Sequence, residues 1–302
     1  MDLRLLRYAV AVADAGHITR AAETLGIAQP PLTRQIRNLE AELGVQLFHR
    51  IPRGVELTEA GAVFVAEARE LLAQAAELPA IARRAARGEE GRIAVGYTSS
   101  ATFNPFVPRQ IRAFRRAWPG VGIVLEEDAT RAMVQALRED RLDAAFIRST
   151  TADLTGLTVE PLLEEPMILA LPSDHIYGWR SAAVDLSDLA AETFILYRRP
   201  AGQGLYDAII AACLEAGFSP NVAQEAPRLP STLSLVAAGL GVSIVPASMR
   251  HLNVDGVAYL DISSAPGLVA PLLLATRKSE RSVIVQRFRA AAREEALPQG
   301  QA

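Results

Sequence analysis

The sequence has very little cysteine: Cys213 is the only one among its 302 residues. A single thiol excludes an internal disulfide and any zinc site built from several cysteines, and it is typical of a reducing compartment. Cys213 lies in the stretch AACLEA, which favours a buried apolar role over a redox sensor. The four histidines are scattered without the spacing of a metal site. We therefore expect neither a metal nor a cofactor.

The sequence also lacks long apolar runs and the common catalytic motifs. It has no stretch of about 18 apolar residues that could span a bilayer, and Asp2 and Asp14 argue against a secretory signal. We therefore expect a cytoplasmic protein with no membrane span; a transport-type solute-binding protein would need the missing signal. A Gly-x-Ser-x-Gly elbow, a phosphate loop and a dinucleotide fingerprint are all missing, so we expect no enzyme.

Charge is unevenly placed although the net charge is only −3. With 50% hydrophobic residues, the chain can form about two or three domains with real cores. Residues 1–60 hold seven basic and seven acidic side chains, but no acid lies within residues 24–39 or 43–55. The cations of these two segments are Arg34, Arg37, Arg50 and Arg53. They predict a local positive surface, which would need several copies to bind a polyanion tightly.

Two short helical patterns meet at Gly26 within residues 18–42. Their apolar positions are Ala21, Ala22 and Leu25 in the first pattern, and Leu32, Ile36, Leu39 and Leu43 in the second. The second set has the spacing of an amphipathic helix, and two helices joined by a turn with glycine form a helix-turn-helix. A helical hairpin in an all-α core is the alternative. An earlier helix over residues 2–14, ended by Gly16, would pack beneath the motif.

Residues 48–58 alternate in polarity around a Pro-Arg-Gly turn, which predicts a two-stranded wing. A basic wing that follows a helix pair favours DNA binding over the hairpin. We expect Thr19 to cap the second helix, and Pro30 and Pro31 to fit the first turn of the third. The side chains expected to contact phosphates and base edges are Thr19, Arg20, Gln29, Pro30, Pro31, Thr33, Arg34, Gln35, Arg37, Asn38, Arg50 and Arg53.

A long helix rich in alanine and leucine is predicted over residues 58–87, with a length of about 45 Å. Its heptad seam consists of Phe64, Ala68, Leu71, Ala75, Leu78 and Ala82. A narrow apolar stripe predicts dimerisation with a second copy, and packing on the helix's own domain is the alternative. Pro79 predicts a kink or break. Gly88 and Gly91 are expected to bracket a hinge.

Strand and helix patterns alternate after this hinge, which predicts a parallel α/β sheet. The expected strands are residues 92–97, 121–126, 142–147, 166–171, 193–197, 242–246 and 271–276. The expected helices end near residue 118 or span 130–139, 205–216, 231–238 and 282–294.

Polar side chains follow several of the predicted strands, at the positions where ligands of open α/β sheets bind. Hydroxyls and free N–H groups at a helix start suit a carboxylate, and arginines favour a small anion. The candidate effector-binding residues are Ser99, Ser100, Thr102, Thr130, Arg148, Arg198 and Gln203. The alternative is that these hydroxyls only cap helices and that the arginines only pair with surface acids.

The pattern AA…L…AQP-L-RQI-LE-ELG-LF-R…LT-AG in the first sixty residues resembles the DNA-binding domain of LysR-type transcriptional regulators. The later segments also fit, so the resemblance covers essentially the whole chain. It implies a winged helix-turn-helix over 1–58, a dimerising linker helix over 59–88, and a two-lobed α/β effector domain like a periplasmic binding protein over 91–296. Lobe I would comprise 91–163 and 266–296 and lobe II 164–265, with a tail over 297–302.

The resemblance also implies partners: double-stranded promoter DNA, further copies of the chain in a dimer or dimer of dimers, a small acidic effector, and RNA polymerase if the protein is an activator. The segments GYTSSATFNPFVP and QEAPRLPSTLSLVAAGLGVSIVP most resemble the branch that senses intermediates of aromatic catabolism, such as muconates and benzoates. Ser100 and Thr130 match that branch's ligand-binding hydroxyls, whereas Arg198 and Arg199 replace smaller residues. An amino acid or another organic acid is therefore the alternative effector.

Overall fold

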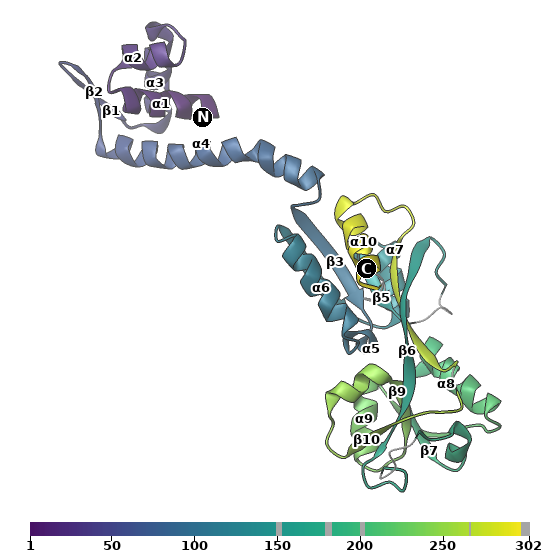
Figure 1. Ribbon diagram of the computed structural model, residues 1–302. Helices are drawn as coiled ribbons and strands as arrows, with labels where there is room; N and C mark the ends of the chain where they lie inside the picture. The colour runs from purple at the N-terminus through teal and green to yellow at the C-terminus, as the bar shows by residue number, and fades with distance from the viewer. Residues whose placement is uncertain (149–152, 179–182, 200–202, 266, 297–302) are drawn as a thin grey trace. The chain divides into compact units, whose positions relative to one another are not determined.

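The computed structural model of the protein describes residues 1–148, 153–178, 183–199, 203–265 and 267–296. The chain forms two compact units, Met1–Arg84 and Ala85–Ala302, and each is described by itself (Figure 1). The predicted tail at 297–302 and residue 266, the expected second lobe crossing, lie outside the described residues. Of Gln203, only the backbone is described.

The N-terminal unit contains a three-helix core followed by a hairpin and a long helix. Its elements are α1 (Leu3–Ala15), α2 (Ile18–Thr24), α3 (Gln29–Leu43), β1 (Phe48–Ile51), β2 (Gly54–Leu57) and α4 (Glu59–Ala86), which continues past the unit's end. Asp2 caps α1 by accepting a hydrogen bond from the Leu5 N–H at 3.0 Å, and Gly16 ends it in the left-handed conformation. The strands β1 and β2 pair antiparallel, which confirms the predicted wing. We call the part of this unit before α4 the head.

Helix α4 is continuous from Glu59 to Ala86, so of the kink or break predicted at Pro79 the break does not occur. Proline removes one backbone hydrogen bond from a helix interior. Because Pro79 and its surroundings are exposed, water can satisfy the carbonyl that loses its partner. The buried residues of α4 are Gly61, Val65 and Ala68, and all three lie in its first half.

The second unit has two lobes, each with its own hydrophobic core. Lobe I contains β3 (Gly91–Tyr97), α5 (Ser99–Thr102), α6 (Phe106–Ala117), β4 (Val121–Glu127), α7 (Thr130–Arg138), β5 (Ala144–Ile147), β11 (Val269–Arg277) and α10 (Val283–Ala296). These elements confirm the alternating pattern that the sequence predicts for this part of the chain. Phe114, Phe146 and Phe288 pack edge-to-face at the centre of the lobe.

Seven described strands of this unit form a mixed sheet, so the prediction of a parallel one is wrong in part, while β7 (Thr193–Tyr197) and β8 (Asn221–Ala226) pair parallel in a separate two-stranded sheet. The strand β3 runs parallel to β4 and β5, whereas β11 runs antiparallel to β5 and β6. The strand β6 (Leu157–Pro172) has 16 residues and passes from lobe I into lobe II. It pairs first with β11 and then with β9 and β10. The strand expected at 166–171 is only the last part of β6.

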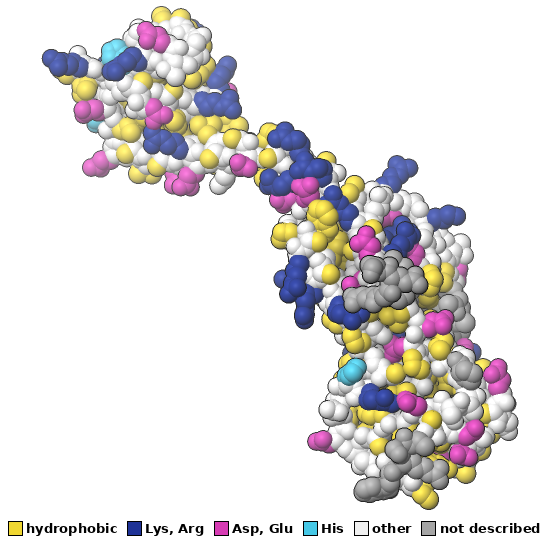
Figure 2. Space-filling model, viewed as in Figure 1, with side chains coloured by type: hydrophobic (Ala, Val, Ile, Leu, Met, Phe, Trp, Pro, Cys, Tyr) yellow, Lys and Arg dark blue, Asp and Glu magenta, His cyan; other side chains and the backbone are white. Residues whose placement is uncertain are grey.

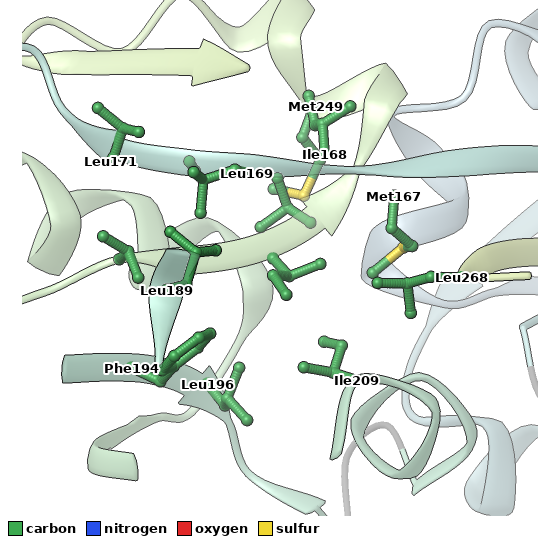
Figure 3. Packing of buried hydrophobic residues seen from close by; sticks show 14 of the residues in the cluster. Met167, Ile168, Leu169, Leu171, Leu189, Phe194, Leu196, Ile209, Met249 and Leu268 are labelled. Atoms are coloured by element: carbon green, nitrogen blue, oxygen red, sulfur yellow. The ribbon is translucent and has the colours of Figure 1, made fainter. Parts of the chain in front are cut away.

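Lobe II is built on the second half of β6. Its other elements are η1 (Leu186–Leu189), β7 (Thr193–Tyr197), α8 (Gln203–Glu215), β8 (Asn221–Ala226), α9 (Leu229–Ala237), β9 (Ser243–Pro246), η3 (Ala247–Leu252) and β10 (Val257–Asp261). Figure 3 shows Leu169 and Leu171 of β6 in the same core as Phe194 and Leu196 of β7. Cys213 is buried in this core, and burial raises the pKa of its thiol to about 11. A thiol so protected suits the predicted apolar role.

Among the described residues, no helix combines the length and the apolar character that a membrane span requires.

Candidate DNA-binding surface and effector cavity

Helix α3 turns its apolar residues into the core of the head and leaves its polar face open. Arg34, Arg37 and Asn38 are exposed, and Thr33 and Gln35 are half-buried. Within the described part of the chain, no acidic side chain pairs with either arginine. Figure 2 shows basic side chains distributed over the head on the visible face. The predicted contact residues of α3 therefore lie on an accessible surface with unpaired positive charge.

The start of α2 differs from the prediction. His17 caps the helix, because its Nδ1 accepts a hydrogen bond from the Thr19 N–H at 3.2 Å, so the assignment of Thr19 as the cap is wrong. The Thr19 hydroxyl instead donates to Gln29 Oε1 at 3.2 Å. This contact joins the first turn of α2 to the first turn of α3. Arg20, Pro30 and Pro31 are exposed beside it.

The wing is fixed to the rest of the head by backbone contacts. The Val55 N–H donates to the Gly16 carbonyl at 2.9 Å. Gly54 has φ +145°, and a Cβ placed on it would lie 2.1 Å from the Gly16 oxygen. At the other end of the hairpin, Glu40 Oε1 accepts from the N–H groups of Leu47 and Phe48 at 2.8 and 3.1 Å. Neither Glu40 nor Gly54 was among the predicted site residues, since their roles depend on tertiary contacts.

A groove of about 370 Å³ lies between α3 and the wing. Its polar lining includes Thr33, Arg37, His49 and Arg50. His49 is exposed and adds a third possible donor to the wing, where the sequence singled out only Arg50 and Arg53. Arg53, at the wing tip, is exposed and does not line the groove.

The predicted dimerisation seam of α4 divides into two parts. Ala68 is 1% exposed, and Phe64 packs against the core of the head, so these two residues serve the head rather than a partner. Leu71 and Leu78 are 48% and 61% exposed, and Ala75 is half-buried. Ala68 is therefore wrongly assigned to the seam, because the first half of α4 packs on its own domain.

One stripe of α4 is apolar and exposed, and it shares Leu71 and Leu78 with the predicted seam. It consists of Val63, Leu71, Leu78 and Ile81, which are 67%, 48%, 61% and 40% exposed. At about 100° per residue these positions fall within about 80° of one another around the helix. They form one face, rotated away from the face that packs on the head. We call it the exposed stripe of α4.

A cavity of about 250 Å³ lies between the two lobes. It is lined from lobe I by residues that follow β3, β4 and β5, and from lobe II by residues at the end of β7 and the starts of α8 and α9. The lining residues are Thr98, Ser99, Ser100, Glu127, Asp128, Ala129, Thr130, Arg148, Tyr197, Gly204, Leu205, Pro227, Arg228 and Leu229. Strand ends thus converge on it, as expected for an open α/β sheet.

Four of the seven predicted effector residues meet in this cavity: Ser99, Ser100, Thr130 and Arg148. Thr102 does not, because it lines a separate groove beside α6. Arg198 is exposed and lies outside the cavity lining. The side chain of Gln203 is outside the described residues. The helix start predicted here contributes little, since α5 has only four residues.

The cavity carries acids that the sequence reading missed. Glu127 and Asp128 line it, and the Ser99 hydroxyl donates to Glu127 Oε1 at 2.6 Å. Arg228, also missed, lies with its Nη1 3.6 Å from the same oxygen. The lining therefore contains two arginines and two carboxylates, and Ser99 already has an acceptor.

Arg148 is buried rather than open to a ligand: its side chain is 3% exposed and its Nη2 donates to Glu165 Oε2 at 3.0 Å. Its Nη1 donates to the Ala270 carbonyl at 3.0 Å, and its Nη2 also donates to the Ser100 carbonyl at 3.1 Å. Burial lowers the pKa of Arg148, and the charge of Glu165 opposes this shift. Burial disfavours the charged form of Tyr197 as well, which raises the pKa of this phenol. Tyr197 therefore lines the cavity as a neutral group.

Among the described residues, no group of three or more histidine, cysteine or acidic side chains could hold a metal ion.

Two family models match the chain. Residues 3–62 match "Bacterial regulatory helix-turn-helix protein, lysR family", and residues 86–297 match "LysR substrate binding domain". Among similar proteins, the transcriptional regulator BudR of Raoultella terrigena is 36% identical over 288 residues, which cover 95% of this chain and 99% of BudR. The regulator BenM of Acinetobacter baylyi is 35% identical over 286 residues, which cover 94% of this chain and 93% of BenM.

Solved structures show the same arrangement of elements. Full-length CbnR, complexed with its target DNA, has a TM-score of 0.78 at 31% identity and covers 98% of this chain and 100% of its own. Full-length BenM has a TM-score of 0.61 at 33% identity, with 97% of this chain and 96% of its own covered.

Proposed function

The chain belongs to the LysR family of DNA-binding transcriptional regulators, and we propose that a small acid in the cavity between its lobes controls how it binds promoter DNA. The observation that supports this most directly is that the chain has both an exposed surface of unpaired arginines on α3 and a polar cavity in the other unit. A regulator that binds promoter DNA acts where the DNA is, so we propose that this protein works in the cytoplasm.

We assign base reading to the polar face of α3 and phosphate contacts to the wing beside it. Arg34 is the residue on which we place most weight, because it is exposed and unpaired and can donate two parallel hydrogen bonds to guanine. Gln35 and Asn38 can pair similarly with adenine. Arg50 and Arg53 on the wing are suited to phosphates, which hold a protein in register without reading sequence.

Self-association follows from the exposed stripe of α4 and from charge. Four large apolar side chains on one helix face leave a surface that a second copy can cover. The near balance of basic and acidic residues in residues 1–60 means that one head alone attracts DNA only locally. We propose a dimer through α4, and a dimer of dimers when bound to DNA. An activator of this kind also contacts RNA polymerase.

The cavity suits a small organic acid. Its volume of about 250 Å³ is below the range of about 300–1,000 Å³ typical of drug-sized ligands, so a benzoate-sized molecule is the appropriate scale. Hydroxyls of Ser100 and Thr130 and the guanidinium of Arg228 can bind a carboxylate. These features support an effector of the benzoate or muconate type.

A second effector class is favoured by one specific observation. Glu127 and Asp128 also line the cavity, and a carboxylate-only ligand would face two like charges. An effector that carries a donor as well as a carboxylate, such as an amino acid or a hydroxy acid, would satisfy both kinds of group. Similarity to relatives does not decide between the two effector classes, because three different regulators match the chain almost equally well. They are BudR, AlsR of Bacillus subtilis and BenM, at 36%, 36% and 35% identity.

We propose that the effector changes the angle between the lobes. Movement of the lobes would then shift the linker helices and with them the spacing of the heads on the promoter, as a rigid-body switch. Effector binding therefore needs no contact with DNA.

The test is a gel-shift titration on the promoter region of the adjacent genes, with the parent protein and Arg34→Ala. We expect Arg34→Ala to weaken binding by about 1–3 kcal/mol, that is by about 5- to 150-fold, if the arginine reads a base. Arg281→Ala, which removes an exposed arginine from the other unit, serves as the control and should bind as the parent does. Equal binding by Arg34→Ala and the parent would overturn the assignment of α3. A thermal-shift screen of aromatic acids, amino acids and hydroxy acids then separates the two effector classes.

A further inference from the structure

A buried carboxylate lies where β6 passes from lobe I to lobe II. It belongs to Glu165, which is 6% exposed and is followed by the residues of β6 that pair with β9 and β10. Three side chains surround it, and they come from both lobes. They are Asn104 and Arg148 of lobe I and Ser248 of η3 in lobe II, with exposures of 7%, 3% and 7%.

The two oxygens of this carboxylate are divided between the lobes. Oε2 accepts from Arg148 Nη2 at 3.0 Å and also from Asn104 Nδ2. Oε1 accepts from the backbone N–H of Ser248 at 3.2 Å and from its hydroxyl at 2.8 Å. One side chain therefore bonds lobe I with one oxygen and lobe II with the other. We call this set the Glu165 tie.

The tie also reaches the cavity. Arg148 lines the cavity, and its Nη2 bonds both Glu165 and the carbonyl of Ser100, another lining residue. A ligand that displaces Ser100 or Arg148 therefore acts on Glu165 and, through it, on Ser248. Buried hydrogen-bonded charges of this kind hold their geometry firmly, because an unpaired partner in the interior is costly.

The present arrangement leaves one buried donor unsatisfied. Arg148 Nε has no hydrogen-bond partner among the described residues, although both of its Nη groups are bonded. Buried polar groups are nearly always paired, so a water, a ligand or another arrangement of this side chain would have to satisfy this donor. Glu165 is the carboxylate that holds Arg148 in its present position.

We propose that Glu165 is a positioning residue that fixes the angle between the lobes when the cavity is empty, and that its bond to Ser248 is the part of the tie that yields when the lobes move. The proposal deepens the proposed function, because it names the contact through which cavity occupancy would reach lobe II. It does not depend on which acid fills the cavity.

The test uses Ser248→Ala, which removes the hydroxyl bond to Glu165 but leaves the backbone one. Ser243→Ala is a matched control: Ser243 is a buried serine of the neighbouring strand β9, and its hydroxyl has no partner among the described residues. Nitroxide labels on Arg131→Cys in lobe I and Leu214→Cys in lobe II report the distance between the lobes, since both positions are exposed. The native Cys213 is buried and will not be labelled. Labelled full-length protein is diluted with unlabelled protein, so that only distances within one chain are measured.

In the effector-free protein, Ser248→Ala should broaden the distribution of interlobe distances and shift its mean, while Ser243→Ala should match the parent. Glu165→Gln should also broaden the distribution, because an amide offers one acceptor oxygen where the carboxylate offers two. If Glu165→Gln fails to fold, the two serine variants still decide the question. A Ser248→Ala distribution equal to the parent, or an equal change in Ser243→Ala, would overturn the proposal. Because no effector or DNA is present, such a failure is separate from a failure of the gel shift, which tests the proposed function.

Discussion

The contact between Gly54 and Gly16 allows a quantitative prediction about the wing. In Gly54→Ala the new Cβ would lie 2.1 Å from the Gly16 oxygen, so the wing must move by about 1.5 Å to reach ordinary contact. A residue with a side chain at φ +145° is also strained, by about 1–3 kcal/mol. Loss of the Val55–Gly16 hydrogen bond adds about 0.5–1.5 kcal/mol. The head should therefore lose about 1.5–4.5 kcal/mol of stability.

Gly44→Ala is the control in the same head, because it brings the backbone strain of a positive φ without a steric contact. Gly44 has φ +70°, but nothing lies within 4 Å of a Cβ built there. It should cost only about 1–2 kcal/mol, because the left-handed conformation is its only penalty. Hydrogen exchange of the amides in α1 and α3 measures both losses as opening free energies.

The same pair of variants tests whether the wing binds phosphates. If Arg50 and Arg53 each contact one, displacement of the wing should reduce the slope of log affinity against log salt by about 2. Gly44→Ala should keep the parent slope. If Gly54→Ala and Gly44→Ala show the same opening free energies and the same slope, the wing is not held by the Gly16 contact and the reasoning is refuted.

Two further predictions concern the linker helix and lobe I. Leu78→Glu places a charge on the exposed stripe of α4 and should shift the protein from dimer toward monomer in sedimentation at micromolar concentration. The control is Ala73→Glu, which is exposed on another face of the helix and should leave the dimer intact. A dimer that survives Leu78→Glu would place the interface elsewhere. Burial raises the pKa of Glu160, but its bonds to Arg293 and Arg289 prevail and the net shift is downward. A lowered folded-state pKa gives stability that is present above the ordinary value of 4.5 and is lost as the pH falls through the folded-state pKa. Denaturation curves should therefore show that Glu160→Gln destabilises the protein at pH 7 and costs progressively less below pH 4.5, and a constant cost at all pH values would contradict this origin.

The head was predicted well because its signals are local. The apolar spacing of α3, the proline pair in its first turn and the glycine after α1 each act over a few residues. Dependence on local signals also explains why the assignment of Thr19 as the cap of α2 failed. Cap preferences favour threonine, whereas the actual cap is His17, which is not among the preferred residues. Nothing in the local pattern distinguishes the two.

The strands of lobe II were predicted less well because their pattern is interrupted or polar. Pro161 and Pro166 both lie within β6, although proline is disfavoured inside strands, and the expected strand began only at Pro166. The strand β8 has the sequence NVAQEA, with little apolar alternation, and was missed together with β10. Antiparallel pairing of β6 with β11 joins residues about a hundred positions apart, such as Glu165 and Ala270, and the local sequence carries no signal for it. The mixed sheet could therefore not be derived from the alternation of strands and helices.

Local sequence likewise cannot show which charged groups of the cavity pair with one another, and this pairing decides which class of effector fits. The sequence places Arg148 at a strand end, which favours an anion, but it cannot show that Glu165, 17 residues later, already pairs with it. Nor can it show that Glu127 and Asp128 join Arg228 in the lining. Once the buried pair is set aside, the lining keeps one arginine, two carboxylates and several hydroxyls, and Arg228 and Ser99 both lie against Glu127. A balanced set of this kind selects a ligand with both donors and acceptors, so the effector class follows from tertiary pairing rather than from the arginine alone.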